Sequence, residues 1–322
     1  MKENFAAKNE IYKPKIKIIG VGGCGTNAVN EITARGIGNV DLFVIDSDKN
    51  SLESSLLDTK YKIQIGEKLT NGLGTGGNPN IGESAAEESI EEIRKIVNGT
   101  DILLIINGVA GGSAGAVPVI TKLAKEQGAV NIVFAVTPVH FEGKRKNENG
   151  EKALQKFMEK ENCIDSIINA SNERFTELAD RQSTLNDVFN MVNKKTAECI
   201  ENFADIFTDE KGLVQISFKD FKEFITNAGF TGIGTSQMCP FDKQQDATEE
   251  VMNHPLIKGS FESAEKVIIS IKGGSDLTLN FVHEITKEIT DKIDENAEVM
   301  LSVQITLLGK FLNQFVITVI TA

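Results

Sequence analysis

The first half of the chain alternates short apolar runs with longer amphipathic segments. The apolar runs have the length of buried strands, and the segments between them repeat apolar residues at helical spacing, as in Ala86, Ile90, Ile93 and Val97. Short strands that alternate with helices predict an α/β fold with a Rossmann-like parallel sheet covered on both faces. The expected strands span residues 15–20, 42–45, 102–106, 132–136 and 164–168, and the expected helices span 28–34, 83–97, 117–127 and 151–159.

A long amphipathic helix is predicted from about residue 184 to residue 203. Its apolar positions step by three and four and fall on one stripe, so it should pack along a large surface between two halves of the protein. The segment after it predicts strand, helix, strand and helix, then strands 299–307 and 311–320 around a turn at Gly309 and Lys310. The stripe consists of Leu185, Val188, Phe189, Val192, Thr196, Cys199, Ile200 and Phe203. The expected organisation is an N-terminal extension (1–14), a first domain (15–183), the central helix (184–206) and a C-terminal domain (207–322).

The composition excludes several classes of function. A net charge of -12, 6% aromatic residues and no Trp argue against a nucleic-acid partner. The start of the chain has no apolar signal-peptide core, and no apolar run is long enough to span a bilayer, so direct membrane insertion is not expected. The four Cys and three His residues are scattered, which predicts no metal site of these residues and a reduced, cytoplasmic protein.

The first candidate site is the glycine-rich turn at residues 20–27 (GVGGCGTN). It follows a strand and opens a helix, so the backbone amides of Gly22, Gly23, Cys24 and Gly25 could approach a phosphate at the helix N-terminus. Asp46 ends the second strand, near the position of the ribose-binding acid in dinucleotide folds. This turn alone favours a dinucleotide site, and a tight turn without a ligand is the plain structural alternative.

Two further glycine-rich loops change this interpretation. One spans residues 72–79 (GLGTGGNP), and the other spans residues 107–115 (NGVAGGSAG) between a strand and a helix. Three such loops at the carboxyl edge of one parallel sheet could surround a longer polyphosphate tail than a dinucleotide carries. The second loop could also be a flexible surface loop. The candidate residues in these two loops are Gly74, Gly108, Gly111, Gly112, Ser113 and Gly115.

These motifs together resemble the tubulin/FtsZ family of GTPases. Residues 20–30, 68–82, 141–145 and 172–174 follow the family's nucleotide loops in order, and the register holds from about residue 16 to residue 321. The resemblance implies a tubulin-like GTPase domain, a long central helix and a smaller α+β C-terminal domain. It also implies bound GTP or GDP with Mg²⁺ as an accompanying ion, and head-to-tail assembly in bacterial cell division. The partners would be copies of this chain, or another member of the family, at the division site.

The resemblance assigns roles to individual residues. The amides of the first turn would meet the α- and β-phosphates, and Glu142 would contact the ribose. Phe189 matches the residue that stacks on guanine, although a plain core position would explain it as well. The remaining assignments are Asn27 and Asn172 to guanine or ribose, Arg145 or Lys146 to a phosphate, and Asn193 to the guanine edge, where the family has Asp.

Two departures from the family pattern concern hydrolysis. The third loop is one residue shorter than the family's glycine run, which would weaken discrimination between GTP and GDP. Where the family has Asn, Asp and Asp, this chain has Gln215, Ser217 and Asp220, within the stretch (207–220) that would complete a neighbouring subunit's site. Loss of a positioned catalytic group costs about 10²–10⁴-fold in rate. Slow GTP hydrolysis is therefore expected, with Asp220 the residual catalytic residue unless it only stabilises a helix start.

Three hypotheses about the function remain. The first is a GTP-dependent, filament-forming GTPase. The second is a non-catalytic paralogue that forms or regulates filaments without turnover, which the altered stretch around Ser217 favours. The third is an NAD-type dehydrogenase. The first glycine turn and Asp46 support it, but the second half of the chain has no obvious catalytic His.

Overall fold

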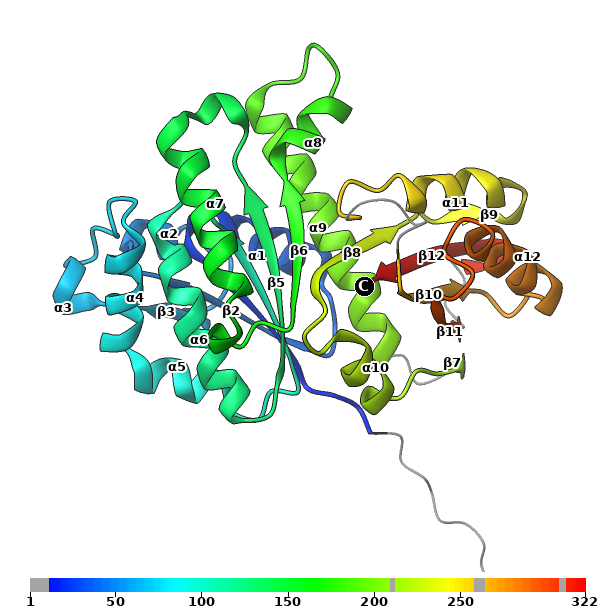
Figure 1. Ribbon diagram of the computed structural model, residues 1–322, viewed down its shortest axis with the longest axis horizontal. Coiled ribbons are helices and arrows are strands. Elements are labelled where there is room, and N and C mark those ends of the chain that lie inside the picture. Colours follow the sequence, from blue (N-terminus) through cyan, green and yellow to red (C-terminus); the bar gives the residue numbers. More distant parts are fainter. Residues whose placement is uncertain (1–11, 209–211, 258–263, 307–310) are drawn as a thin grey trace, which may run out of the picture.

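Strands from both halves of the chain form one continuous path in the computed structural model (Figure 1). The structure describes residues 12–208, 212–257, 264–306 and 311–322. Within this part the strand order is β3-β2-β1-β4-β5-β6-β8-β12-β10-β11-β7, with β9 paired to β12. The strands are β1 (Ile16–Val21), β2 (Val40–Asp46), β3 (Lys62–Gln64), β4 (Ile102–Gly108), β5 (Val130–Thr137), β6 (Ser166–Ser171), β7 (Gly212–Val214), β8 (Gly229–Thr235), β9 (Cys239–Pro240), β10 (Lys266–Gly273), β11 (Glu298–Ile305) and β12 (Gln314–Thr321).

Helices cover both faces of the N-terminal sheet, in which all neighbouring strands from β3 to β6 are parallel. The longer helices are α1 (Gly22–Arg35), α4 (Pro79–Glu88), α5 (Ile90–Val97), α6 (Ala116–Glu126), α7 (Lys144–Met158), α8 (Asn172–Leu178), α9 (Leu185–Thr208), α10 (Phe218–Ile225), α11 (Gln244–Met252) and α12 (Leu279–Thr290). The short helices are α2 (Lys49–Glu53), α3 (Glu67–Thr70) and the 3₁₀ turns η1 (Thr59–Tyr61), η2 (Gly112–Gly115), η3 (His140–Glu142), η4 (Lys160–Asn162) and η5 (Phe241–Lys243). Among the described helices, none combines the length and apolar character needed to cross a bilayer.

Successive side chains of the central strands pack into two separate cores, one on each face of the sheet. Ile18 of β1 and Leu104 of β4 pack with residues of α1 and α9 on one face. Their neighbours Ile19 and Leu103 pack with residues of α5 and α6 on the other face. Because both faces are buried, these strands are apolar throughout rather than alternating apolar and polar, as expected for a parallel sheet.

Helix α9 lies between the two halves, as the sequence predicts. Its apolar residues share a core with strand residues from both halves, including Phe134 of β5 and Ile320 of β12. Ion pairs reinforce this position, since Glu198 of α9 lies 3.0 Å from Arg35 of α1, and Lys195 lies 3.3 Å from Glu250 of α11. The central helix thus connects the helix behind the first glycine turn to the C-terminal half.

The structure corrects three predicted elements. Strands β11 and β12 do not pair as a hairpin, because β10 lies between them, parallel to β11 and antiparallel to β12. The turn at Gly309 and Lys310 lies outside the described residues, as does most of the predicted 1–14 extension. The single helix predicted at 83–97 is two helices separated at Ser89, whose hydroxyl accepts a hydrogen bond from the amide of Gly66 at 3.1 Å. Helix α7 begins at Lys144, well before the predicted start at residue 151.

Candidate functional site

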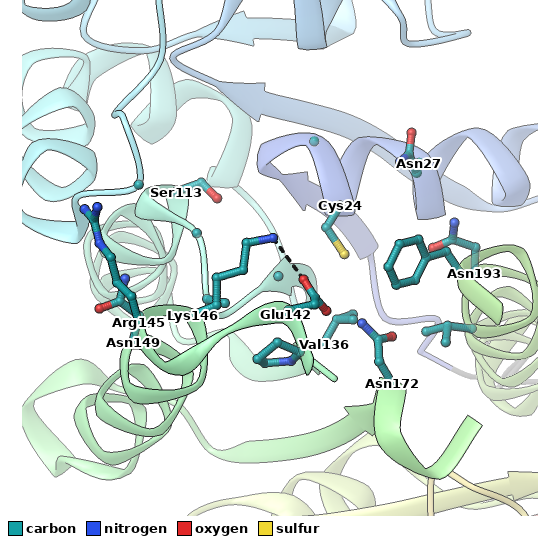
Figure 2. Close-up of a pocket in the computed structure, with 18 of the residues that line it drawn as sticks. Cys24, Asn27, Ser113, Val136, Glu142, Arg145, Lys146, Asn149, Asn172 and Asn193 are labelled. Carbon is teal, nitrogen blue, oxygen red and sulfur yellow. Dashed lines mark hydrogen bonds and ion pairs between the residues drawn. The ribbon is translucent and has the colours of Figure 1, made fainter. Parts of the chain in front are cut away.

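A cavity of about 580 Å³ lies at the carboxyl ends of the parallel strands, between the glycine turns and helix α9 (Figure 2). This is the crevice position that ligands occupy in open α/β sheets. Twelve of the residues singled out from the sequence line it: Gly23, Cys24, Asn27, Gly108, Gly111, Ser113, Glu142, Arg145, Lys146, Asn172, Phe189 and Asn193. The structure therefore brings together candidate residues that lie far apart in the chain.

The first glycine turn presents the N-terminus of α1 to the cavity. Gly22 has a φ of 77°, a left-handed conformation that favours glycine, and it starts the helix directly after β1. The N-cap residue Val21 makes no side-chain capping bond and the first turn holds no acidic residue, so the amides of this turn suit an anion. Gly25 does not line the cavity, because it packs on the strand: a Cβ atom there would collide with the carbonyl oxygen of Ile106.

The second and third glycine loops lie directly against each other. A Cβ atom on Gly112 would collide with Thr75, and one on Gly115 would collide with the carbonyl oxygen of Pro79. Gly74 has a φ of 77° and faces Asp48. Gly112 and Gly115 thus let the two loops approach closely, while Gly108, Gly111 and Ser113 face the cavity.

Charged side chains reach the cavity from η3 and the start of α7. Glu142 accepts a hydrogen bond from the amide of Val139 at 2.9 Å, and the Nζ atom of Lys146 lies 2.9 Å from Glu142 Oε2. Arg145 and Asn149 lie one helical turn apart beside them, on the same side of the cavity as Ser113 in Figure 2. Two cations at this end suit the negative charge of phosphate groups.

Amide and aromatic side chains form the opposite end of the cavity. Asn27 of α1, Asn172 of α8 and Asn193 of α9 lie there in Figure 2, and Phe189 precedes Asn193 by one turn of α9. The Oδ1 atom of Asn172 is buried without a hydrogen-bond partner among the described residues. Because buried polar atoms are normally hydrogen-bonded, this oxygen is a candidate acceptor for a ligand. Phe189 is half-buried and does not belong to the described apolar cores, so it is not a plain core residue.

The Cys24 thiol lies between these two ends. Burial, together with the smaller effect of the negative charge of Glu142, raises its pKa to about 12. At neutral pH this side chain is therefore a neutral thiol and not a nucleophile. Its contribution to the site is the backbone amide and the shape of the wall.

Two groups of predicted residues lie away from the cavity lining. Asp46 is buried, and its Oδ1 atom accepts a hydrogen bond from the amide of Asp48 at 3.0 Å; burial raises its pKa. Gln215, Ser217 and Asp220 are exposed around the start of α10. Ser217 caps this helix by accepting a hydrogen bond from the amide of Asp220 at 3.1 Å, and its hydroxyl donates to Asp220 Oδ2 at 2.7 Å.

Several lining residues were not among the predicted site residues. Asn149 follows Arg145 by one turn of α7, a helix whose first turns have no apolar periodicity that would reveal it. Val192 follows Phe189 at helical spacing, which could have identified it. The additional lining residues are Gly76, Gly77, Ala110, Val136, Pro138, Asn149 and Val192. Within the described residues, no group of three or more His, Cys, Asp or Glu side chains is arranged to hold a metal ion.

Comparisons with known proteins agree with this architecture. The family model for the GTPase domain of the tubulin/FtsZ family matches residues 15–180, and the model for the C-terminal domain of the FtsZ family matches residues 229–322. The cell division protein FtsZ of Aquifex aeolicus is 36% identical over 288 residues, which cover 89% of this chain and 77% of that protein.

Solved structures show the same similarity. An empty FtsZ dimer from M. jannaschii matches with a TM-score of 0.84 and 28% identity, over 96% of this chain and 88% of that chain. A GTPγS-bound protofilament of CetZ2 from Haloferax volcanii matches with a TM-score of 0.78 over 95% of this chain and 92% of that chain. At 17% identity, the CetZ2 match shows a shared fold only.

Proposed function

Because the chain belongs to the tubulin/FtsZ family of GTPases, we propose that it binds GTP and GDP in the cavity and assembles head to tail into filaments. A role in bacterial cell division, in the cytoplasm and at the division site, follows from its similarity to the FtsZ of Aquifex aeolicus. The similarity to a structure described as an FtsZ dimer supports self-association. Co-assembly with another member of the family is part of the same proposal.

One observation carries the nucleotide assignment. Amide and aromatic side chains line one end of the cavity, and glycine loops and positively charged side chains line the other end. Phe189 offers a face on which a base can stack, and Asn172 offers an unpaired acceptor. At the other end, the free amides of α1 and the charges of Arg145 and Lys146 suit phosphate groups. A guanine nucleotide would lie across the cavity, with the ribose near Glu142.

Mg²⁺ would accompany the phosphate groups. In nucleotide sites this ion usually keeps several waters and binds phosphate oxygens, so few protein ligands are needed. When bound, it would neutralise negative charge on the phosphates. The protein's own contribution is to hold the phosphates in place with backbone amides and cations.

The stretch from Gln215 to Asp220 supports slow hydrolysis. Its side chains Gln215, Ser217 and Asp220 are exposed and lie outside the cavity lining of their own subunit, where they could meet a neighbouring subunit. Of its three candidate side chains, only Asp220 is a carboxylate, and Ser217 already occupies one of its oxygens. One carboxylate in place of two is expected to lower the rate by about 10²–10⁴-fold.

The second candidate is a filament protein without turnover. Its support is specific: Asp220 and Ser217 bond to each other as a helix cap, which gives Asp220 a structural role that needs no catalysis. In this case the nucleotide would regulate assembly but would not be consumed.

We also propose the domain limits expected from the sequence, with the break at α9.

Sedimentation and phosphate release separate the two candidates. The purified chain is incubated with Mg²⁺ and GTP, GDP or no nucleotide, and pelleting and released phosphate are measured in the same samples. The proposal predicts more pelleting with GTP than without nucleotide, together with slow phosphate release. Pelleting without any release supports the second candidate, and pelleting that ignores nucleotide contradicts both.

A further inference from the structure

The side-chain amide of Asn107 lies between the first and third glycine loops. It lies in β4, is fully buried, and donates hydrogen bonds through Nδ2 to the carbonyl oxygen of Val21 at 2.9 Å and to Ser113 Oγ at 3.2 Å. Val21 immediately precedes the first glycine turn, and Ser113 belongs to the third loop. One amide group thus connects the first glycine loop to the third.

The orientation of this amide follows from its partners. A carbonyl oxygen can only accept a hydrogen bond, so Nδ2 of Asn107 must face Val21. The second hydrogen on Nδ2 then points to Ser113 Oγ, which accepts it. The Ser113 hydroxyl therefore keeps its own hydrogen, which remains available for donation to a group in the cavity that Ser113 lines.

The position of Ser113 indicates what that hydrogen can reach. Ser113 lines the cavity, and Figure 2 places it at the end near Lys146 and Arg145, away from Asn193. A Cβ atom on Gly22 would collide with the Ser113 side chain, so glycine at that position leaves the space that the hydroxyl occupies. If the base lies at the Asn193 end, the nucleotide group nearest Ser113 would be the terminal phosphate.

We propose that Asn107 is a positioning residue that fixes the Ser113 hydroxyl as a hydrogen-bond donor to the terminal phosphate of GTP. This inference rests on the proposed binding of guanine nucleotides in the cavity. A hydroxyl that accepts one hydrogen bond is a stronger donor of the next, because neighbouring bonds polarise each other. The pair would favour GTP over GDP even though the third loop is short.

The test compares GTP and GDP affinities of the full chain. Equilibrium dialysis with Mg²⁺, at protein concentrations too low for assembly, gives both affinities for the wild type, Asn107→Ala, Ser113→Ala and the double variant. Hydrogen bonds to charged groups correspond to about tenfold or more in affinity. Each single variant should therefore bind GTP about tenfold more weakly and GDP about twofold more weakly at most. In the Ser113→Ala background, Asn107→Ala should cause little further loss.

Asn131 provides the matched control. It is also fully buried, donates through Nδ2 to two carbonyl oxygens, those of Thr121 and Cys163, and lies near the start of β5, away from the cavity lining. Asn131→Ala should lose folding stability as Asn107→Ala does, but keep the wild-type ratio of GTP to GDP affinity.

The outcomes distinguish the inference from the proposed function. If Asn107→Ala or Ser113→Ala lowers GTP and GDP affinity equally, or leaves GTP affinity unchanged, the inference is overturned while nucleotide binding stands. Additive losses in the double variant overturn it as well. A wild-type protein that binds neither nucleotide contradicts the proposed function itself. Since Ser113 borders the cavity and is not part of the core, its variant keeps the test valid if Asn107→Ala fails to fold.

Discussion

Lys146 and Glu142 form an ion pair at the cavity, with 2.9 Å between Nζ and Oε2. The other oxygen of Glu142 accepts a hydrogen bond from the amide of Val139, so the carboxylate is held in place. The Glu142 side chain is 16% exposed, whereas that of Lys146 is 58% exposed. Lys146 is therefore the mobile partner, and a phosphate group can compete for it.

Replacing Lys146 by Met should weaken nucleotide binding. The lost charge faces the cavity but is largely exposed, so solvent screening limits the expected change to about 1 kcal/mol, or about fivefold in affinity. The effect should shrink at high salt. Lys144→Met is the matched control, because Lys144 is 90% exposed and outside the lining. Equal effects of both variants, measured by equilibrium dialysis, would contradict this role of Lys146.

Phe189→Ala should weaken GTP and GDP binding alike. Stacking of a base on an aromatic side chain contributes about 1–3 kcal/mol, and this contact does not involve the phosphates. Leu185, one turn earlier on α9, is exposed and outside the lining, so Leu185→Ala should leave affinity unchanged. A Phe189→Ala protein with wild-type affinity would place the base elsewhere.

Ser217→Asp should raise GTP turnover at least about tenfold, because a second carboxylate would again be available to position the attacking water. Asp and Asn both serve well as helix caps, so the start of α10 is preserved in either variant. Ser217→Asn, which adds no charge, should stay at the wild-type rate. Steady-state phosphate release from assembled protein measures both. Wild-type turnover equal to that of Ser217→Asp would show that the missing carboxylate does not limit the rate.

His254 should make stability depend on pH. It is 4% exposed, and burial lowers its pKa to about 3, with the charge of Lys195 acting in the same direction. Its unfolded value is near 6.5. The unfolded state therefore binds the proton first as the pH falls, and stability is lost below about pH 6.5. Between pH 7 and pH 5 the loss from this group is about 2 kcal/mol.

Urea denaturation at pH 7 and pH 5 measures this loss. His254→Leu should reduce the difference between the two pH values by about 2 kcal/mol. The exposed His283 is the control, and His283→Gln should keep the wild-type difference. An unchanged difference in His254→Leu would assign the acid sensitivity to other groups.

Much of the fold is predictable because the relevant signals are local. The strand at Ile16–Val21 is apolar at most positions and fully buried, and the stripe along α9 does pack between the two halves. The local pattern does not reveal the break at Ser89, where the hydroxyl accepts a hydrogen bond from the amide of distant Gly66. The pairing of β11 with β10 instead of β12 is also a tertiary choice that the local pattern does not contain.

The candidate site shows the same division. A glycine-rich turn predicts a close approach of backbone, but not whether a ligand or another loop makes that approach. Gly23 and Gly111 face the cavity, whereas Gly112 and Gly115 pack on the second loop. The sequence alone does not place Lys146 on a helix, because the first residues of α7 are polar and show no apolar periodicity. The structure shows that α7 begins at Lys144, which brings Lys146 to the cavity.

Equilibrium binding of guanine nucleotide tests the central claim most directly. The purified, folded chain is dialysed against GTP or GDP with Mg²⁺, and nucleotide extracted from the fresh preparation is identified by chromatography. The account predicts one guanine nucleotide per chain, with binding weakened by Phe189→Ala and by Lys146→Met. Folded protein that carries no nucleotide and binds neither GTP nor GDP at millimolar concentration would contradict it.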